Sequence, residues 1–299
     1  QNNIIGYSNS IMGTSVLNTV IGSKNNLKGT SSKNFIAGFN NSNKTGENIT
    51  NNQIIGNDWT VGVSIANSVL LGNSNTLNTS KAVVIGYGNS INGTTSVAVG
   101  NENNINSNNV FVLGNNVTVS GNLNGAVVLG NNSAVESAVH VNNSKVGVIT
   151  YGNFAGSTPA VGDVISVGST TAPRQIQNVA AGQITAASLD AINGSQLYAT
   201  QTVISNVVDS VKDVLGGNAT VGSDGKLSMS NIGDTGKGNI NDAIKEAYKK
   251  AGEAGKVAGS GKDGKDGSNG SDGASITGPT GKDGLNGKDL TDKTNALRN

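Results

Sequence analysis

The sequence predicts a mainly β chain that begins with a parallel β-roll, a stack of two-strand coils, and continues into a short coiled coil and a small α+β segment. Three observations support this prediction. Apolar runs that end in glycine recur through the first 130 residues. The stretches between them consist largely of Asn, Ser, Thr and Gly. Aromatic residues make up 3% of the chain and charged residues 13%, so large side chains for a thick core are scarce.

The repeat is defined by glycines that close an apolar run. Every interval between successive glycines is an even number of residues, between 14 and 18. A strand has a period of two, so even intervals return each side chain to the same face of the stack. Residues 81–100 contain one complete repeat. The repeat glycines are at positions 6, 22, 38, 56, 72, 86, 100, 114 and 130.

The apolar positions of the repeat predict two different cores. Both residues before each glycine are apolar, which is typical of a strand buried on both faces. Five residues after the glycine a single apolar residue recurs, with Asn43 as the exception, so the second strand has one buried face. The first strand needs a partner outside its own roll. Identical chains around an axis would provide that face, and we expect a homotrimer.

The sequence of the repeat resembles that of a known family. Runs that end in VIG or AVG, followed by a polar turn and NSING or NNINS, resemble the YadA-like head of trimeric autotransporter adhesins. The resemblance implies that residues 1–172 form a trimeric, left-handed parallel β-roll head. The pattern weakens after residue 131, so we expect a frayed lower end there, with a final strand at residues 162–168.

Residues 173–196 carry the most specific motif of the chain. RQIQNVAAG at residues 174–182 and DAIN at residues 190–193 closely resemble the neck of these adhesins. The resemblance implies that the chain crosses to its neighbour here. Arg174 and Asp190 are candidates for an interchain salt bridge; the alternative is that both charges are solvated.

Residues 197–215 have the heptad pattern of a coiled coil that ends at Gly216. Residues 216–252 predict a hairpin turning at Asp224 and Gly225, then a helix with Asn239 as N-cap, and resemble a stalk connector of the same family. Residues 253–299 are glycine-rich and include nine Gly-X-Y triplets, which are compatible with a collagen-like triple helix or a flexible linker. One heptad position holds Leu197, Ile204 and Val211, and the other holds Gln201, Val208 and Leu215.

Residues that perform catalysis or bind metals are scarce. The chain has no cysteine and one histidine, His140, and residues 1–159 contain one Asp and three Glu. We therefore expect no enzyme activity, cofactor or metal site; a carbohydrate-active β-helix would need an acidic cluster, and calcium-binding repeats would need a regular Asp. A net charge of +1 predicts no basic surface for nucleic acid or acidic lipid.

Four aromatic residues are candidates for receptor binding. Tyr7, Phe39 and Tyr87 directly follow repeat glycines, and Trp59 stands three residues after Gly56, where Asn is usual. Exposed aromatic side chains often anchor protein interfaces. The alternative is that they pack between coils or subunits. The longest interval, residues 38–56, is expected to push a loop outward beside Trp59.

The resemblance implies a bacterial cell-surface adhesin exposed at the outer membrane. It would bind a host cell-surface receptor, such as an immunoglobulin-like one, or an extracellular matrix protein. The alternative is a structural fibre for autoaggregation, biofilm formation or serum resistance. The sequence opens in mid-repeat without a signal peptide or transmembrane run. We therefore expect a fragment of a longer protein whose C-terminal membrane anchor is absent from it.

Overall fold

The computed structural model describes residues 1–259, and the Gly-X-Y triplets lie outside this range. The chain divides into two compact units, Gln1–Gln201 and Thr202–Asn299. The predicted triple helix or linker is therefore not among the described elements.

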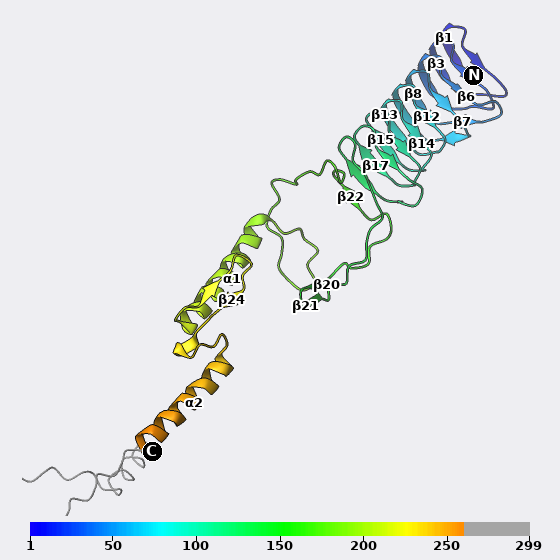
Figure 1. Cartoon of the computed structure of the whole chain (residues 1–299). Coiled ribbons are helices and arrows are strands. Elements are labelled where there is room, and N and C mark those ends of the chain that lie inside the picture. Colours follow the sequence, from blue (N-terminus) through cyan, green and yellow to red (C-terminus); the bar gives the residue numbers. More distant parts are fainter. Residues whose placement is uncertain (260–299) are drawn as a thin grey trace, which may run out of the picture. The chain divides into compact units, whose positions relative to one another are not determined.

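The first unit is a parallel β-roll, with successive coils stacked along one axis (Figure 1). Each inner strand pairs in parallel with the equivalent strand of the next coil, and the repeat glycines align, as in Gly6 with Gly22 and Gly72 with Gly86. The predicted repeat is confirmed. The ten-stranded inner sheet consists of β1 (Asn3–Tyr7), β3 (Thr19–Ser23), β5 (Phe35–Phe39), β8 (Gln53–Asn57), β11 (Val69–Asn73), β13 (Val83–Tyr87), β15 (Val97–Val99), β17 (Phe111–Leu113), β19 (Val127–Leu129) and β22 (Ile165–Ser166).

The outer sheet is built from the second strand of each coil and has eight strands. All of its pairs are parallel, as in β12 with β14. These strands are two residues long because each one is followed at once by the turn back to the inner sheet. They are β2 (Ser10–Ile11), β4 (Asn26–Leu27), β6 (Ser42–Asn43), β9 (Thr60–Val61), β12 (Thr76–Leu77), β14 (Ser90–Ile91), β16 (Asn104–Ile105) and β18 (Thr118–Val119).

A short third side is present only in the N-terminal coils. β7 (Ile49–Thr50) pairs in parallel with β10 (Ile65–Ala66). Single bridges from Val16 to Ser32 and from Ser32 to Thr50 extend this side toward the N-terminal coils. These coils have glycine intervals of 16 or 18 residues, whereas the next three intervals are 14 residues. The additional residues therefore form a third wall and widen the interior.

The two predicted apolar faces of the inner strand are confirmed. From the second coil on, the residue two positions before the repeat glycine is buried inside the roll, as in Leu70 and Val84, and it meets buried outer-strand residues such as Leu77. Ile4, in the first coil, is 47% exposed. The residue directly before the glycine points to the other side of the sheet. Ile5 is 53% exposed and Leu113 50%, so a second apolar surface faces away from the roll.

The lower end of the roll differs from the expectation. After β19 the chain leaves the stack, forms an antiparallel hairpin of β20 (Asn143–Val146) and β21 (Ile149–Gly152), and returns as β22, which pairs with β19. Backbone hydrogen bonds hold the two arms together, at 2.9 Å from Ala138 N to Val161 O. The expected final strand is therefore present, but the expectation of a frayed end is wrong because the stretch is a paired hairpin.

The helix α1 (Gly194–Leu215) begins three residues before the predicted coiled coil and ends where predicted, and Gly216 and Gly217 that follow it have positive φ angles of 61° and 60°. None of its residues is buried. The residues at both predicted heptad positions are therefore not buried within the described chain.

The second unit contains the predicted hairpin and helix. β23 (Thr220–Val221) pairs antiparallel with β24 (Leu227–Ser228), and a short 3-10 helix, η1 (Ile232–Asp234), follows. Asn239 caps α2 (Ile240–Gly259) as predicted, since its Oδ1 accepts a hydrogen bond from Asp242 N at 2.9 Å. The helix α2 continues past the expected boundary at residue 252, through helix-forming residues such as Glu253 and Ala254.

Candidate functional site

A ladder of asparagines, buried except for the half-buried Asn9, runs along the roll at the position three residues after six of the nine repeat glycines. The Asn25 amide donates one hydrogen bond to Asn9 Oδ1 at 3.0 Å and another to Gly38 O at 2.9 Å. Asn89 repeats the arrangement with Asn75 and Gly100 at 2.8 Å each. Each amide therefore satisfies one polar group in each neighbouring coil, which stabilises a polar corner inside an apolar interior.

Trp59 occupies one position of this ladder. Its side chain is 1% exposed, and its indole Nε1 donates a hydrogen bond to Gly72 O at 2.9 Å. Asparagine amides make the equivalent bond in six other coils. The prediction that Trp59 is an exposed receptor anchor is therefore wrong. The physical reason is the third side of the roll, where the buried Ile49 and Ile65 line a wider interior that accommodates an indole.

The other three aromatic candidates are exposed but do not form one patch. Tyr7 is 75% exposed, Tyr87 53% and Phe39 41%. Tyr7 lies on β1, Phe39 on β5 and Tyr87 on β13. In the sheet, β3 separates Tyr7 from Phe39, and β8 and β11 separate Phe39 from Tyr87. Each stands two residues after the outward apolar residue of its strand, so all three belong to the outward face of the inner sheet. Lys24 Nζ lies 5.3 Å from the centre of the Phe39 ring.

The expected loop beside Trp59 is a short turn. Residues 44–46 are exposed, and Asn43, the exception in the apolar column, is buried with its amide donating to Lys28 O at 2.8 Å and to Glu47 O. This turn and the buried indole lie in the same part of the roll, but the turn presents lysine and threonine to solvent instead of the aromatic ring.

The two sheets present opposite chemistry to the outside. The inner sheet shows an apolar face, as described above. The outward position of the outer sheet, four residues after the glycine, is polar in every coil, a regularity that the sequence analysis did not use although it is visible in the repeat. The column consists of Ser10, Asn26, Ser42, Thr60, Thr76, Ser90, Asn104 and Thr118.

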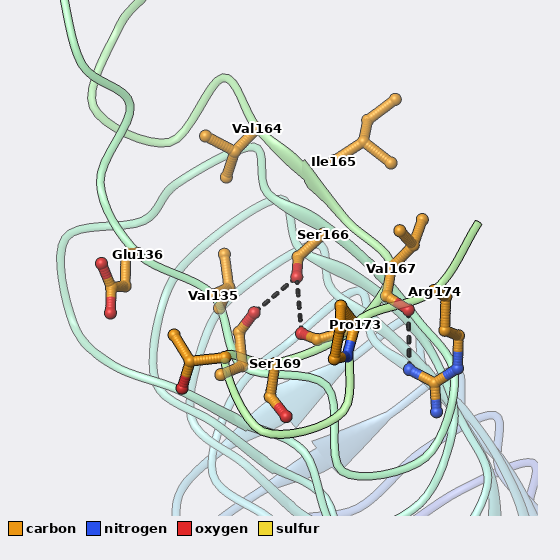
Figure 2. A pocket seen from close by; sticks show the side chains of 12 residues that line it. Val135, Glu136, Val164, Ile165, Ser166, Val167, Ser169, Pro173 and Arg174 are labelled. Atoms are coloured by element: carbon orange, nitrogen blue, oxygen red, sulfur yellow. Dashed lines mark hydrogen bonds between the residues drawn. The ribbon is translucent and has the colours of Figure 1, made fainter. Parts of the chain in front are cut away.

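Arg174 closes the lower end of the roll (Figure 2). Its guanidinium donates to Val167 O at 2.6 Å, to Asn131 O at 2.8 Å and to Ser133 Oγ at 3.0 Å. It borders an open hollow of about 430 Å³ that is also lined by Val135, Val164 and Pro173. The carbonyl groups of Val167 and Asn131 would face the next coil if the stack continued. Arg174 supplies their hydrogen-bond donors instead.

Asp190 has a partner of its own within the chain, because its Oδ2 accepts a hydrogen bond from Gln183 N at 3.0 Å. An interchain salt bridge between Arg174 and Asp190 would compete with the contacts of both side chains, and it stays a prediction. The neck is also tied to α1: Gly182 N donates to the Gln196 side chain at 2.9 Å and Gly182 O accepts from it at 2.7 Å.

The described residues offer little for catalysis. Residues 1–259 contain no group of three or more potential metal ligands, and His140 Nε2 meets only the carbonyl of Pro159, at 3.1 Å. The hydrogen bonds from Lys226, 3.0 Å away, lower the pKa of Asp224 in an exposed turn. Within residues 1–259, no helix is both long enough and apolar enough to cross a membrane.

The comparisons with known proteins point to one family. The family described as "Coiled stalk of trimeric autotransporter adhesin" matches residues 175–220. The chain is also 40% identical over 87 residues to the trimeric autotransporter adhesin AtaA of Acinetobacter sp. (strain Tol 5), and 41% identical over 75 residues to the autotransporter adhesin BtaE of Brucella suis biovar 1 (strain 1330). These matches support a trimeric autotransporter adhesin.

A third such adhesin, EhaG of Escherichia coli O157:H7, is 45% identical over 71 residues. These three alignments cover 29%, 25% and 23% of this chain, but only 2%, 10% and 4% of the respective adhesins. The chain therefore corresponds to a small part of each relative. The adhesin relatives favour a non-enzymatic role.

Among solved structures, the C-terminal YadA-like domain of BPSL2063 from Burkholderia pseudomallei is 32% identical and has a TM-score of 0.32. The alignment covers 42% of this chain and 52% of that one. At this score the assignment of the β-roll depends on the strand pairing itself, not on the superposition.

Proposed function

We propose that the chain is the exposed part of a bacterial cell-surface adhesin, a homotrimeric fibre held at the outer membrane by a separate anchor, whose β-roll attaches the cell to a host receptor or matrix protein. The observation that carries the proposal is the apolar outward face of the inner sheet. Ile5, Ile55 and Leu113, from three different coils, are between 43% and 53% exposed in the single chain.

This face is too long and too apolar to remain in water. It extends over ten strands, about 45 Å at the usual spacing between strands. Soluble monomers rarely expose contiguous apolar patches of that extent. A second and third copy of the same face are the simplest partners, because α1 also leaves its apolar stripe of Leu197, Ile204 and Val211 exposed and the family is trimeric by name.

Residues 1–172 are proposed as the head, 173–196 as the neck, 197–215 as the trimeric coiled coil, and the following unit as a connector toward the anchor. Tyr7, Phe39 and Tyr87 share the apolar face, so in this trimer they lie at subunit boundaries. Their position favours packing between subunits over receptor binding. The receptor would then contact the polar surface of the outer sheet.

Beads coated with the 299-residue chain test the proposal. Wild-type beads are expected to attach to cultured host cells or to immobilised matrix proteins. The variant Ile85→Asp places a charge in the trimer contact and should reduce attachment by about tenfold or more, because three weak sites no longer act together. Asn109→Asp, at an exposed corner outside both sheets where φ is 56°, is the matched control for the added charge.

The same beads separate the structural alternative. Beads that clump with one another, yet bind neither cells nor matrix proteins, would support a fibre for autoaggregation. Attachment that is equally strong for wild type and Ile85→Asp, with both chains monomeric, would contradict the trimeric adhesin.

A further inference from the structure

Positive charge is concentrated in the N-terminal coils of the roll. Residues 1–81 contain five lysines and two acidic residues, whereas residues 82–144 contain two glutamates and neither lysine nor arginine. The net charge of +1 for the whole chain therefore conceals a basic half and an acidic half of the same roll. A field of this kind attracts anionic partners to one end of the roll.

Lys28 and Lys44 form the centre of this basic region. Each lies two residues after an outward residue of the outer sheet, and those residues, Asn26 and Ser42, are register partners in β4 and β6. The two lysines therefore occupy equivalent positions in adjacent coils, about 4.8 Å apart along the stack. Like charges opposite each other are destabilising, so the arrangement is unfavourable without a counterion.

The chain does not supply that counterion. The salt bridges among residues 1–259 join Lys226 to Asp224 and Lys249 to Glu253, both outside the roll. Glu47 is the nearest acid along the chain, but its carboxylate accepts a hydrogen bond from Ser64 Oγ at 2.8 Å in the next coil. An external anion between Lys28 and Lys44 would relieve the repulsion.

The surroundings of the two lysines indicate the kind of anion. The outward positions beside them include Ser42 and Thr60, which offer hydroxyl groups along the fibre direction. No aromatic residue occupies this column, so nothing can stack on nucleobases. The same positions lack the apolar side chains that insert into a lipid surface.

We propose that the outer sheet around Lys28 and Lys44 binds a polyanionic polysaccharide. A sulfate or carboxylate group lies between the two ammonium groups, and sugar hydroxyls hydrogen-bond to Ser42 and Thr60. Identical sites on three subunits make a weak contact effective through avidity. The inference extends the proposed function, since the polysaccharide would be one of the ligands of the adhesin.

The test compares two double variants of the full chain on immobilised heparin. Lys28→Gln/Lys44→Gln removes the paired charges, and Lys33→Gln/Lys81→Gln removes the same charge from two other corners of the roll, where Lys33 and Lys81 have φ angles near 60°. We expect wild type to bind heparin and to be released by salt. The first variant should lose about tenfold in affinity and the control less than about twofold. Thermal melting of both variants checks that the roll is intact.

Several results would overturn the inference. Equal losses in the two variants would indicate general attraction by charge. Binding that survives both removal of the sulfate groups and reduction of the carboxylates of heparin would exclude the anion. Tighter binding of phosphatidylserine vesicles or of single-stranded DNA through Lys28 and Lys44 would assign the site to another class of partner. If Lys28→Gln/Lys44→Gln beads still attach to cells while no chain binds heparin, this inference fails and the proposed adhesin function stands.

Discussion

The indole Nε1 of Trp59 donates a hydrogen bond to the carbonyl oxygen of Gly72 at 2.9 Å. Asn41 makes the same bond to Gly56 at 2.7 Å and Asn75 to Gly86 at 2.7 Å. One tryptophan therefore takes over the polar role of an asparagine amide and fills the wider interior beside Ile49. The aromatic residue that was the strongest binding candidate in the sequence is part of the core.

Substitution of Trp59 should reduce stability. Trp59→Ala leaves a cavity and should lower the free energy of unfolding by about 3–5 kcal/mol. Trp59→Phe retains most of the volume but leaves Gly72 O without its donor, and should cost about 1–3 kcal/mol. Denaturant unfolding followed by circular dichroism measures both. Two variants as stable as wild type would mean that the ring lies outside the core.

The repeat glycines permit the coils to stack. Gly86 has a φ angle of +133°, and a Cβ added there would lie 1.9 Å from Gly100 O. Gly86→Ala should therefore prevent folding or lower the melting temperature sharply, since the contact is with backbone of the next coil. Gly88→Ala is the matched control. Its Cβ would meet only Glu102 Cγ at 3.6 Å, so the expected cost is about 1–2 kcal/mol for a left-handed alanine. Similar losses for both variants would contradict the stacking geometry.

One corner of the roll can be improved. Thr95 has a φ angle of 58°, which is unfavourable for a β-branched residue. Asparagine tolerates this conformation, as at the equivalent Asn109 with φ 56°. Thr95→Asn should raise the free energy of unfolding by about 0.5–1 kcal/mol. Thr60→Asn, in an extended strand, should give no gain, because asparagine is disfavoured there. A gain at residue 60 and none at residue 95 would refute the assignment of the corner.

Arg174 should hold the neck against the last coil. Arg174→Ala removes the charged donor of three oxygen atoms. Because the side chain is exposed, water replaces part of these contacts, and the free energy of unfolding should fall by about 1–2 kcal/mol. Amide hydrogen exchange should accelerate at residues 131–134 and 165–168, with Arg174→Lys as an intermediate case. A double-mutant cycle with Asp190→Ala tests the interchain pair, since additive effects would show that the two side chains do not interact.

The regular part of the fold was predictable because strand geometry leaves a period of two in the sequence. Even glycine intervals and two apolar columns were enough to predict that the two residues before each glycine face different cores. The structure shows which is which, with Val84 inside the roll and Ile85 on its outer face. The helix α1 and the cap at Asn239 followed from a heptad pattern and a local hydrogen bond. These features depend on neighbours along the chain or on a repeat that occurs many times.

Features that depend on a single coil could not be predicted in the same way. The burial of Trp59 requires the third side formed by β7 and β10, which are two residues long each. The hairpin of β20 and β21 occurs once, so no column reveals it. The pairing of Lys28 with Lys44 becomes visible only when β4 and β6 are placed in register.

Sedimentation equilibrium of the 299-residue chain tests the central claim, that the outward apolar face of the inner sheet is a contact between three copies. The single chain has a mass of 30.0 kDa. At micromolar concentration we predict a species of three times that mass, and a shift toward the single-chain mass for Ile85→Asp. A folded wild-type monomer at that concentration would contradict the account.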